Sequence, residues 1–189
     1  MGRWEPDSRG RLQEAALALY SERGFDQTTA AQIAERAGLT ERTFFRHFAD
    51  KREVLFGGSA ILKERIVSAV AGAPASDGAL GAVALGLDAA AAMLGESRRD
   101  LARQRQAVLM ANPELREREL SKLADYAHAI AATLRARGVA EPQATLAAES
   151  GMTVLRVAMQ QWANGDDDRG LDAIMREAVL ELRAVANDG

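Results

Sequence analysis

Apolar residues recur at spacings of three and four along most of the chain, and this periodicity is typical of helices that bury one face. The first such stripe consists of Leu12, Ala15, Ala16, Leu19 and Tyr20. The helix that carries it is expected to begin at Asp7 or Ser8 and to end at Gly24. No segment shows the sustained alternation of apolar and polar residues that is typical of a strand. The pattern therefore predicts an all-α protein without a sheet.

Two short helices separated by a tight turn are predicted next. Thr29 and Gln32 have the spacing of a capping box, in which each side chain binds a backbone amide at the start of a helix. This helix is expected to run to Ala37 and to end at Gly38, because glycine readily adopts the left-handed conformation that closes many helices. Thr40 is then placed to cap the second helix.

The second short helix has one anchoring face and several outward positions. Phe44 and Phe48 are four residues apart and would point the same way. The other positions carry Glu41, Arg42, Thr43, Phe45, Arg46 and His47. A helix presented in this way suits the major groove of duplex DNA, which is wide enough to hold one helix. Asp50 and Glu53 then repeat the capping spacing, so a further helix is expected to start there.

The motifs of this region resemble those of a known family. Gly24-Phe25, Thr28-Thr29, the run IAERAGLT and the run TFFRHFxxKREVL are similar to the N-terminal DNA-binding domain of the TetR family of transcriptional regulators. The resemblance covers about residues 9–56. It implies a three-helix DNA-binding domain over residues 8–56, with its helix-turn-helix motif at 29–48. A C-terminal helical domain over residues 57–189 would bind an effector and form the dimer, giving about nine helices in all.

The resemblance also implies which residues contact DNA. Thr29 and Lys51 match positions that bind backbone phosphate. The residues that match the exposed positions of the family's recognition helix are Glu41, Arg42, Thr43, Phe45, Arg46 and His47. Two departures from the family pattern are Phe45, which replaces the usual tyrosine and its hydroxyl contact, and Ala31, which replaces a longer side chain of some members.

Specificity is therefore expected to depend on Arg42, Thr43 and Arg46. An arginine can bind guanine O6 and N7 through a bidentate fork, or it can bind a phosphate, and both roles remain open for the two arginines. Phe45 can offer apolar contact, for example to a thymine methyl group. His47 can either brace the helix or touch DNA.

Further amphipathic helices are predicted after the DNA-binding motif. Their expected ranges are 51–71, 77–94, 97–112, 113–138, 141–164 and 171–185. Asn112 is expected to cap the fourth of these helices and Pro113 to open it. The last two helices would form a hairpin that buries more surface when it pairs with a copy of itself. The resemblance implies that they form the four-helix bundle of a homodimer.

A small-molecule pocket in the C-terminal domain is also implied by the resemblance. Its candidate apolar lining consists of Met93, Met110, Met152 and Met159, and its candidate polar contacts are Gln104, Tyr126 and Gln160. Methionine suits such a role because its flexible side chain adapts to irregular ligands. The alternative for each of these residues is an ordinary place in the core.

Composition narrows the chemistry. The 189 residues include no cysteine, which excludes disulfides, thiol redox sensing and cysteine-ligated metal sites. His47 and His128 are the only histidines and lie far apart in the sequence, so a histidine metal site is not expected. The three aspartates at 166–168 are interpreted as an acidic start of the last helix rather than as metal ligands. We expect neither a metal nor a cofactor.

The charge is unusual for a DNA-binding protein, because the formal net charge is −3 at pH 7. Residues 1–56 hold nine Lys or Arg and nine Asp or Glu. The positive charge is local and consists of Arg42, Arg46, Lys51 and Arg52, against Glu41 and Asp50. This pattern predicts modest non-specific affinity for DNA and a weak salt dependence per subunit.

The N-terminal residues lack the apolar region of a signal peptide, and no window is expected to be apolar over the length that spans a membrane. We therefore expect a soluble, cytoplasmic protein with no membrane partner. No nucleophile with an adjacent base and no phosphate-binding glycine loop is evident, so an enzyme is not expected.

These observations favour a homodimeric repressor that binds a pseudo-palindromic operator in double-stranded DNA and responds to an unidentified small molecule. One alternative is a DNA-binding regulator that has no small-molecule effector. A small helical enzyme is the other alternative.

Overall fold

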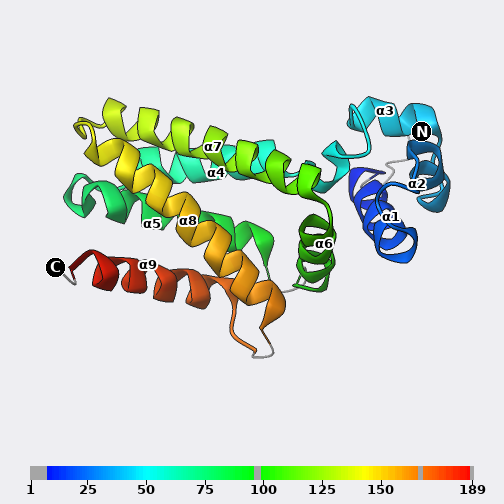
Figure 1. The fold of residues 1–189 in the computed structure, drawn as a ribbon. Helices are drawn as coiled ribbons and strands as arrows, with labels where there is room; N and C mark the ends of the chain where they lie inside the picture. The colour runs from blue at the N-terminus through cyan, green and yellow to red at the C-terminus, as the bar shows by residue number, and fades with distance from the viewer. Residues whose placement is uncertain (1–7, 96–98, 166–167, 188–189) are drawn as a thin grey trace, which may run out of the picture. The chain divides into compact units, whose positions relative to one another are not determined.

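The computed structural model describes residues 8–95, 99–165 and 168–187, and these residues form α-helices and short 3-10 helices without a strand (Figure 1). The helices are α1 (Ser8–Arg23), α2 (Ala30–Arg36), α3 (Glu41–His47), η1 (Glu53–Phe56), α4 (Ser59–Gly72), η2 (Ala75–Asp77), α5 (Gly78–Leu94), α6 (Arg99–Ala111), α7 (Pro113–Ala136), α8 (Gln143–Asn164) and α9 (Leu171–Asn187). The prediction of an all-α fold is confirmed. The expected helix starts at Asp7 and at residue 97, and the aspartates Asp166 and Asp167, lie outside the described residues.

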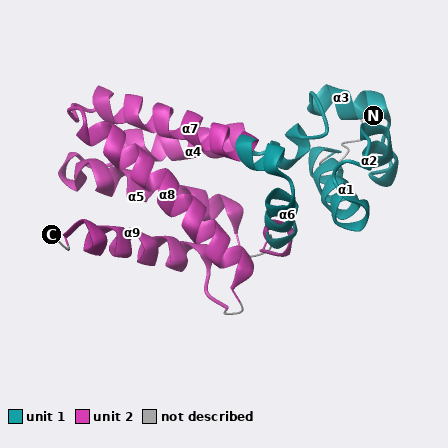
Figure 2. Ribbon diagram, in the orientation of Figure 1, with its two compact units in different colours: residues 1–58, 103–117 teal, residues 59–102, 118–189 magenta. Residues whose placement is uncertain are grey.

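The chain divides into two compact units (Figure 2). Unit 1 comprises residues 1–58 and 103–117, and unit 2 comprises residues 59–102 and 118–189. The expected domains, residues 8–56 and 57–189, stay a prediction. In unit 1, residues 103–117 group with residues 1–58. Arg105 shows why they belong to unit 1: its Nε donates to the Leu55 carbonyl at 3.0 Å, and its guanidinium lies 5.3 Å from the centre of the Phe56 ring.

The three helices α1, α2 and α3 share one small core. Leu12, Ile33 and Phe44, one from each helix, are fully buried. The ring of Phe25 closes this core from the loop after α1, with its centroid 5.2 Å from that of Tyr20. Because apolar side chains from all three helices meet there, each short helix is stabilised by packing that it could not obtain alone.

The prediction of one continuous helix over residues 51–71 was wrong. The Asp50 carboxylate accepts hydrogen bonds from the amides of Arg52 at 2.8 Å and Glu53 at 3.1 Å, but the helix that it starts is only the short η1. Gly57 follows, packed against the Phe48 ring, and α4 begins at residue 59. Two consecutive glycines favour a break because glycine loses more conformational freedom in a helix than any other residue.

The core of unit 2 is built around α5, which packs against α4, α8 and α9. Small residues permit this close packing. A Cβ on Gly86 would stand 3.0 Å from side-chain carbons of Ile66 and Val70 on α4, and a Cβ on Gly151 of α8 would collide with Val83. These contacts explain why glycine stands at residue 86 of α5 and at residue 151 of α8.

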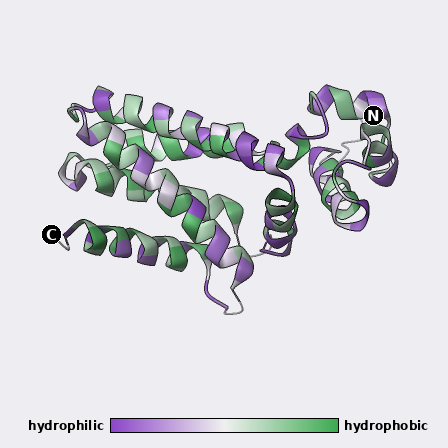
Figure 3. Ribbon diagram, viewed as in Figure 1, coloured by the Kyte–Doolittle hydropathy of each residue, from purple (hydrophilic) through white to green (hydrophobic). Residues whose placement is uncertain are grey.

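That composition also corrects the expectation about membranes. Within the described residues, the segment Ala75–Leu94 has a mean hydropathy of 1.4 and is long and apolar enough to cross a membrane by length and composition alone. In Figure 3, α5 is drawn mostly in the colours of hydrophobic residues. Its buried residues, among them Ala82, Val83 and Leu87, belong to the core of unit 2. The core helix of a soluble protein passes the same test.

At the junction of α6 and α7, one of the two sequence-based predictions is confirmed. Pro113 is the first residue of α7, as predicted. The side chain of Asn112, however, donates to the Val108 carbonyl at 2.6 Å and so binds the last turn of α6 rather than the start of α7.

Candidate nucleic-acid interface

The start of α2 has the predicted capping box. The Gln32 amide donates to the Thr29 hydroxyl at 3.2 Å, and the Thr29 amide donates to the Gln32 side chain at 3.0 Å. Thr29 is exposed. Because its oxygen accepts the bond from Gln32, the hydroxyl hydrogen can still donate to an outside oxygen such as that of a phosphate.

The turn into α3 also follows the sequence prediction. Gly38 has φ of 65°, in the left-handed region, and Thr40 accepts a hydrogen bond from the Thr43 amide at 3.2 Å. The hydroxyls of Thr40 and Thr43 lie 3.0 Å apart and hydrogen-bond each other. The half-buried Thr43 is therefore already tied to the cap of its own helix, which limits how its hydroxyl can reach outward.

The two faces of α3 differ as expected. Phe44 is fully buried and Phe48 is 4% exposed, so together they anchor the helix. Glu41, Arg42, Phe45 and Arg46 are exposed. Phe45 is 53% exposed, which leaves a large apolar ring available to a partner.

Arg52 is occupied by an ion pair. Its guanidinium donates to the Asp50 carboxylate, with Nη2 at 2.7 Å and Nε at 3.1 Å from Oδ2. Burial by itself would raise the pKa of Asp50, but hydrogen bonds from the Arg52 side chain and from the backbone amides of Glu53 and Arg52 lower that pKa overall. Arg52 therefore contributes less positive charge toward DNA than the sequence suggested.

Lys51 is also turned inward. Its Nζ lies 2.8 Å from the Phe25 carbonyl oxygen, 3.0 Å from that of Thr28 and 3.3 Å from that of Asp26. The sequence analysis expected this ammonium to meet a phosphate. Of the four local cations, Arg42 and Arg46 are the two for which the described part of the chain offers no hydrogen bond or ion pair.

His47 is half-buried at the end of α3, and its ring centre lies 6.4 Å from that of Phe48. The Nε2 atom is buried and has no hydrogen-bond partner among the described residues. This burial favours the bracing role over a contact with DNA, because an inward-facing nitrogen cannot reach a base edge.

Two arginines of α1 contact the helix-turn-helix. The sequence did not identify either of them. The guanidinium of Arg9 lies 5.3 Å from the centre of the Phe48 ring. Arg11 donates to the Ala37 carbonyl, next to the left-handed Gly38. Both contacts join residues far apart in the sequence, and no local pattern marks either arginine.

The seven candidate ligand residues differ in their surroundings, and a shared pocket stays a prediction. Tyr126 is buried and donates to the Ser59 carbonyl at 2.7 Å, and Met152 is 4% exposed in the core of unit 2. Met93 and Met159 are half-buried, whereas Gln160 is exposed. Gln104 and Met110 are exposed and belong to unit 1.

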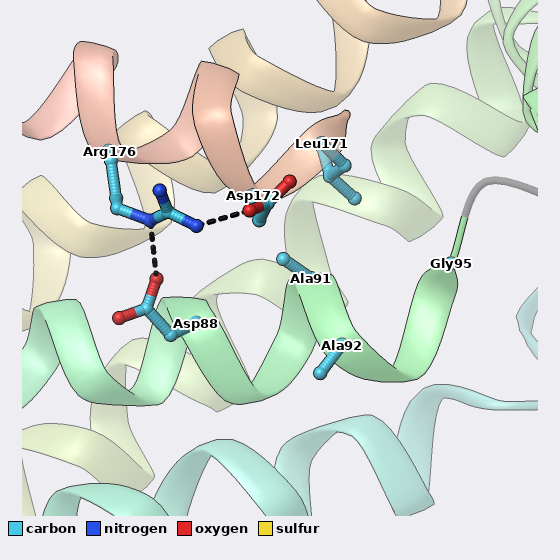
Figure 4. A pocket seen from close by; sticks show the side chains of 7 residues that line it. All are labelled: Asp88, Ala91, Ala92, Gly95, Leu171, Asp172 and Arg176. Atoms are coloured by element: carbon cyan, nitrogen blue, oxygen red, sulfur yellow. Dashed lines mark hydrogen bonds and ion pairs between the residues drawn. The ribbon is translucent and has the colours of Figure 1, made fainter. Parts of the chain in front are cut away.

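A groove that none of these residues lines lies between α5 and α9 (Figure 4). Its volume is about 390 Å³, and its lining consists of Asp88, Ala91, Ala92, Gly95, Leu171, Asp172 and Arg176. The Arg176 guanidinium binds the Asp172 carboxylate and lies 3.6 Å from an oxygen of Asp88. The approach of Arg176 to Asp88, residues far apart in the sequence, could not be anticipated from spacing. No group of three or more metal-ligating side chains occurs in the described residues.

Comparison with known proteins places this geometry in context. Residues 12–56 match the family model of bacterial regulatory proteins of the tetR family. The chain is 37% identical over 120 residues to the HTH-type transcriptional regulator TcmR of Streptomyces glaucescens, which covers 63% of this chain and 52% of that protein. It is 43% identical over 47 residues to the HTH-type transcriptional repressor KstR2 of Mycobacterium tuberculosis, covering 25% of this chain and 24% of that protein. The matched regions thus span about half and about a quarter of these relatives.

Solved structures resemble the whole fold. FadR of Bacillus subtilis, solved in complex with stearoyl-CoA, aligns with a TM-score of 0.63 and 20% identity over 92% of this chain and 96% of that chain. FadR of Thermus thermophilus, solved in complex with lauroyl-CoA, aligns with a TM-score of 0.56 and 24% identity over 93% of each chain. At these identities the likeness is one of fold.

Proposed function

Because this chain belongs to the TetR family of bacterial transcriptional regulators, we propose that it is a repressor that binds a two-fold symmetric DNA operator as a homodimer. The helix α3 is then the recognition helix, which enters the major groove. The protein works in the cytoplasm, without a cofactor, and is not an enzyme.

The observation that carries this proposal is the pair of exposed arginines on α3. Arg42 and Arg46 are four residues apart on a helix whose opposite side is anchored by Phe44. Side chains at this spacing lie on one helix face, so both can reach the same groove. Each can bind a guanine through its bidentate fork, which contributes about 1–3 kcal/mol of discrimination.

Apolar residues on the outer faces of the last two helices support the homodimer. On α8, Leu146 is 62% and Val157 is 42% exposed, and on α9, Leu180 is 62% exposed. Hydrophobic and hydrophilic residues are interspersed along α9 in Figure 3. A second copy would cover these side chains in a four-helix bundle with two-fold symmetry. Such a dimer presents two recognition helices to successive major grooves about 34–36 Å apart.

Unit 2 is the proposed site of effector binding. An effector that favours one arrangement of the two subunits shifts the population away from the DNA-binding arrangement. Long-chain acyl-CoA is the first class to test, because the two FadR proteins were solved with such ligands. The groove between α5 and α9, at about 390 Å³, is near the small end of ligand pockets, which hold about 300–1,000 Å³. A long acyl-CoA would therefore need a further opening of unit 2.

The test begins with selection from a random duplex library at physiological salt. We expect a two-fold symmetric winner that binds far more tightly than scrambled DNA. The variant Arg42→Ala/Arg46→Ala should bind the winner at least about 30-fold more weakly, since two guanine contacts are lost. The control Arg65→Ala/Arg135→Ala removes the same charge from exposed arginines of α4 and α7 in unit 2, outside the proposed dimer helices, and should bind normally. Equal binding by both variants would contradict the proposed recognition helix.

A regulator without a small-molecule effector is the second candidate function. It is favoured by the small volume of the groove between α5 and α9, about 390 Å³, which is near the small end of the range for ligand pockets. A thermal-shift screen separates the two candidates, because an effector at 100 times its dissociation constant adds about 2.7 kcal/mol of stability. A compound that raises the melting temperature and also lowers operator affinity would exclude this alternative.

A further inference from the structure

We propose that Phe45 is a specificity-determining residue that reads the C5 methyl group of a thymine in the major groove. Each operator half-site then carries a thymine close to the guanine that Arg42 binds. This inference rests on the proposed function, because it needs α3 to be the recognition helix.

Phe45 is a large apolar side chain at the surface of α3. It is 53% exposed. Arg42, three residues earlier on the helix, is also exposed, and side chains at this spacing are neighbours on a helix surface. A groove that receives Arg42 therefore also receives the ring of Phe45. Contact with an apolar group of the DNA would remove this ring from water, which is favourable.

The ring of Phe45 has a defined place although it is exposed. It meets the ring of Phe44 edge to face, with the ring centroids 5.3 Å apart and the ring planes at 83°. Phe44 is fully buried in the core that α1, α2 and α3 share. Edge-to-face packing is a preferred arrangement of two aromatic rings. The ring is thus pre-organised, so little conformational freedom is lost when it meets a partner.

A phenylalanine ring suits one feature of the base edges. It has no hydrogen-bond donor or acceptor, so it cannot pair with the polar groups that the bases present. Thymine alone presents an apolar group in the major groove, its C5 methyl, and apolar side chains such as phenylalanine contact this methyl. The chemistry of residue 45 therefore selects thymine over cytosine and over the purines.

The missing hydroxyl changes what residue 45 contributes. The family resemblance implies a tyrosine here, whose hydroxyl would contact a phosphate. Phosphate contacts position a protein on DNA, whereas contacts with base edges specify the sequence. Phe45 keeps the ring without the hydroxyl, so it loses the positioning contact and keeps the specifying one.

Spacing along α3 places the thymine relative to a guanine. Residues three apart on a helix have Cβ atoms about 5–6 Å apart, and successive base pairs are about 3.4 Å apart. The thymine that Phe45 reads therefore lies within about two base pairs of the guanine that Arg42 binds.

Uracil tests this in the selected duplex, because it differs from thymine only in lacking the C5 methyl group. Each symmetric pair of thymines is replaced in turn, and the affinity of the full-length chain is measured by anisotropy. For one pair we expect binding about fourfold weaker per half-site, which corresponds to about 0.8 kcal/mol, the usual contribution of one buried methylene group. This loss is measured on the natural chain and needs no variant.

The variant Phe45→Ala assigns the loss to the ring. It should bind the thymine and uracil duplexes with equal affinity, whereas Phe45→Leu keeps an apolar side chain and should retain part of the preference. Melting temperatures of the three proteins verify that they are folded. If every uracil replacement had the same effect, or none, on the natural chain and on Phe45→Ala, the proposal would be overturned.

5-Methylcytosine provides the converse test. Cytosine, with guanine opposite, replaces the sensitive thymine, and methylation at C5 then restores the methyl group without altering the base pair. We expect the methylated duplex to bind about fourfold more tightly per half-site than the unmethylated one, and this gain should vanish in Phe45→Ala. An identical gain in both proteins would contradict the proposal.

Two further outcomes separate this inference from the proposed function. If Phe45 packs against the sugar-phosphate backbone instead, Phe45→Ala will weaken binding about equally for all sequences, and thymine and uracil will remain equivalent. That result overturns the role of Phe45 and leaves the proposed repressor intact. If the library yields no preferred duplex, the proposed recognition helix fails, and the role of Phe45 fails with it.

Discussion

Gly57 lies against the ring of Phe48, at a place where a Cβ would stand 2.8 Å from Phe48 Cε1 and 2.9 Å from Gln13 Nε2. Phe48 follows the last residue of α3 and is 4% exposed. The glycine therefore lets the chain after η1 pass close to the ring that anchors the recognition helix. The position of α3 depends in part on a residue outside the helix-turn-helix motif.

The substitution Gly57→Ala should lower the free energy of unfolding by about 1–3 kcal/mol, because extra volume in a packed core forces neighbours out of place. Urea denaturation of the full chain measures this. Gly72→Ala is the matched control, since a Cβ at residue 72 meets nothing within 4 Å. If the two variants are equally stable, the Phe48 ring can move aside without cost.

The contact between α5 and α8 gives a second prediction. A Cβ on Gly151 would collide with Val83, whose β-branched side chain has few alternative rotamers. Gly151→Ala should therefore destabilise the chain, and Val83→Ala in the same chain should recover part of the loss. A double-mutant cycle should give a coupling of about 0.5–3 kcal/mol. Strictly additive effects would mean that the helices separate instead.

The cap of α3, the proposed recognition helix, gives a third prediction. Thr40 accepts a hydrogen bond from the Thr43 amide at 3.2 Å. Thr40→Ala should lower the free energy of unfolding by about 1 kcal/mol and weaken operator binding, whereas Thr40→Ser keeps the hydroxyl and most of both properties. Denaturation and anisotropy on the three proteins check this. Equal losses in the alanine and serine variants would contradict a capping role.

The proposed dimer gives a fourth prediction. Leu180 on α9 is 62% exposed, and a second copy would bury it. Leu180→Glu should convert the dimer into a monomer, because an unpaired carboxylate in an apolar interface is strongly unfavourable. Ile61→Glu on α4 is the control, since Ile61 is also exposed, at 48%, but lies outside α8 and α9. Sedimentation equilibrium distinguishes the two; a dimeric Leu180→Glu protein would place the interface elsewhere.

The ion pair between Asp50 and Arg52 gives a prediction about pH. The folded pKa of Asp50 is lowered, so its contribution to stability is present above the unfolded pKa, about 3.9, and is lost as the pH falls through the folded value. Asp50→Asn should therefore be less stable than the natural chain at pH 7, and the difference should shrink below about pH 4. Asp125→Asn, at an exposed position on α7, is the control. A difference that persists unchanged at pH 3 would show that the charge of Asp50 is unimportant.

Much of the helix-turn-helix could be predicted from the sequence because its determinants are local. The capping box of Thr29 and Gln32, the left-handed Gly38 and the cap at Thr40 each involve residues within a few positions of one another. The buried stripe of α1 also follows from helical spacing alone.

The sequence by itself thus determined the all-α class, most helix boundaries and the two outward arginines, Arg42 and Arg46. The tertiary structure alone decided that Lys51 points to the carbonyls before α2 and that residues 103–117 group with unit 1. It also placed the groove between α5 and α9, through the pairing of Arg176 with Asp88. The physical reason is the same in each case. These outcomes depend on contacts between residues that are distant in the sequence, and such contacts leave no local sequence pattern.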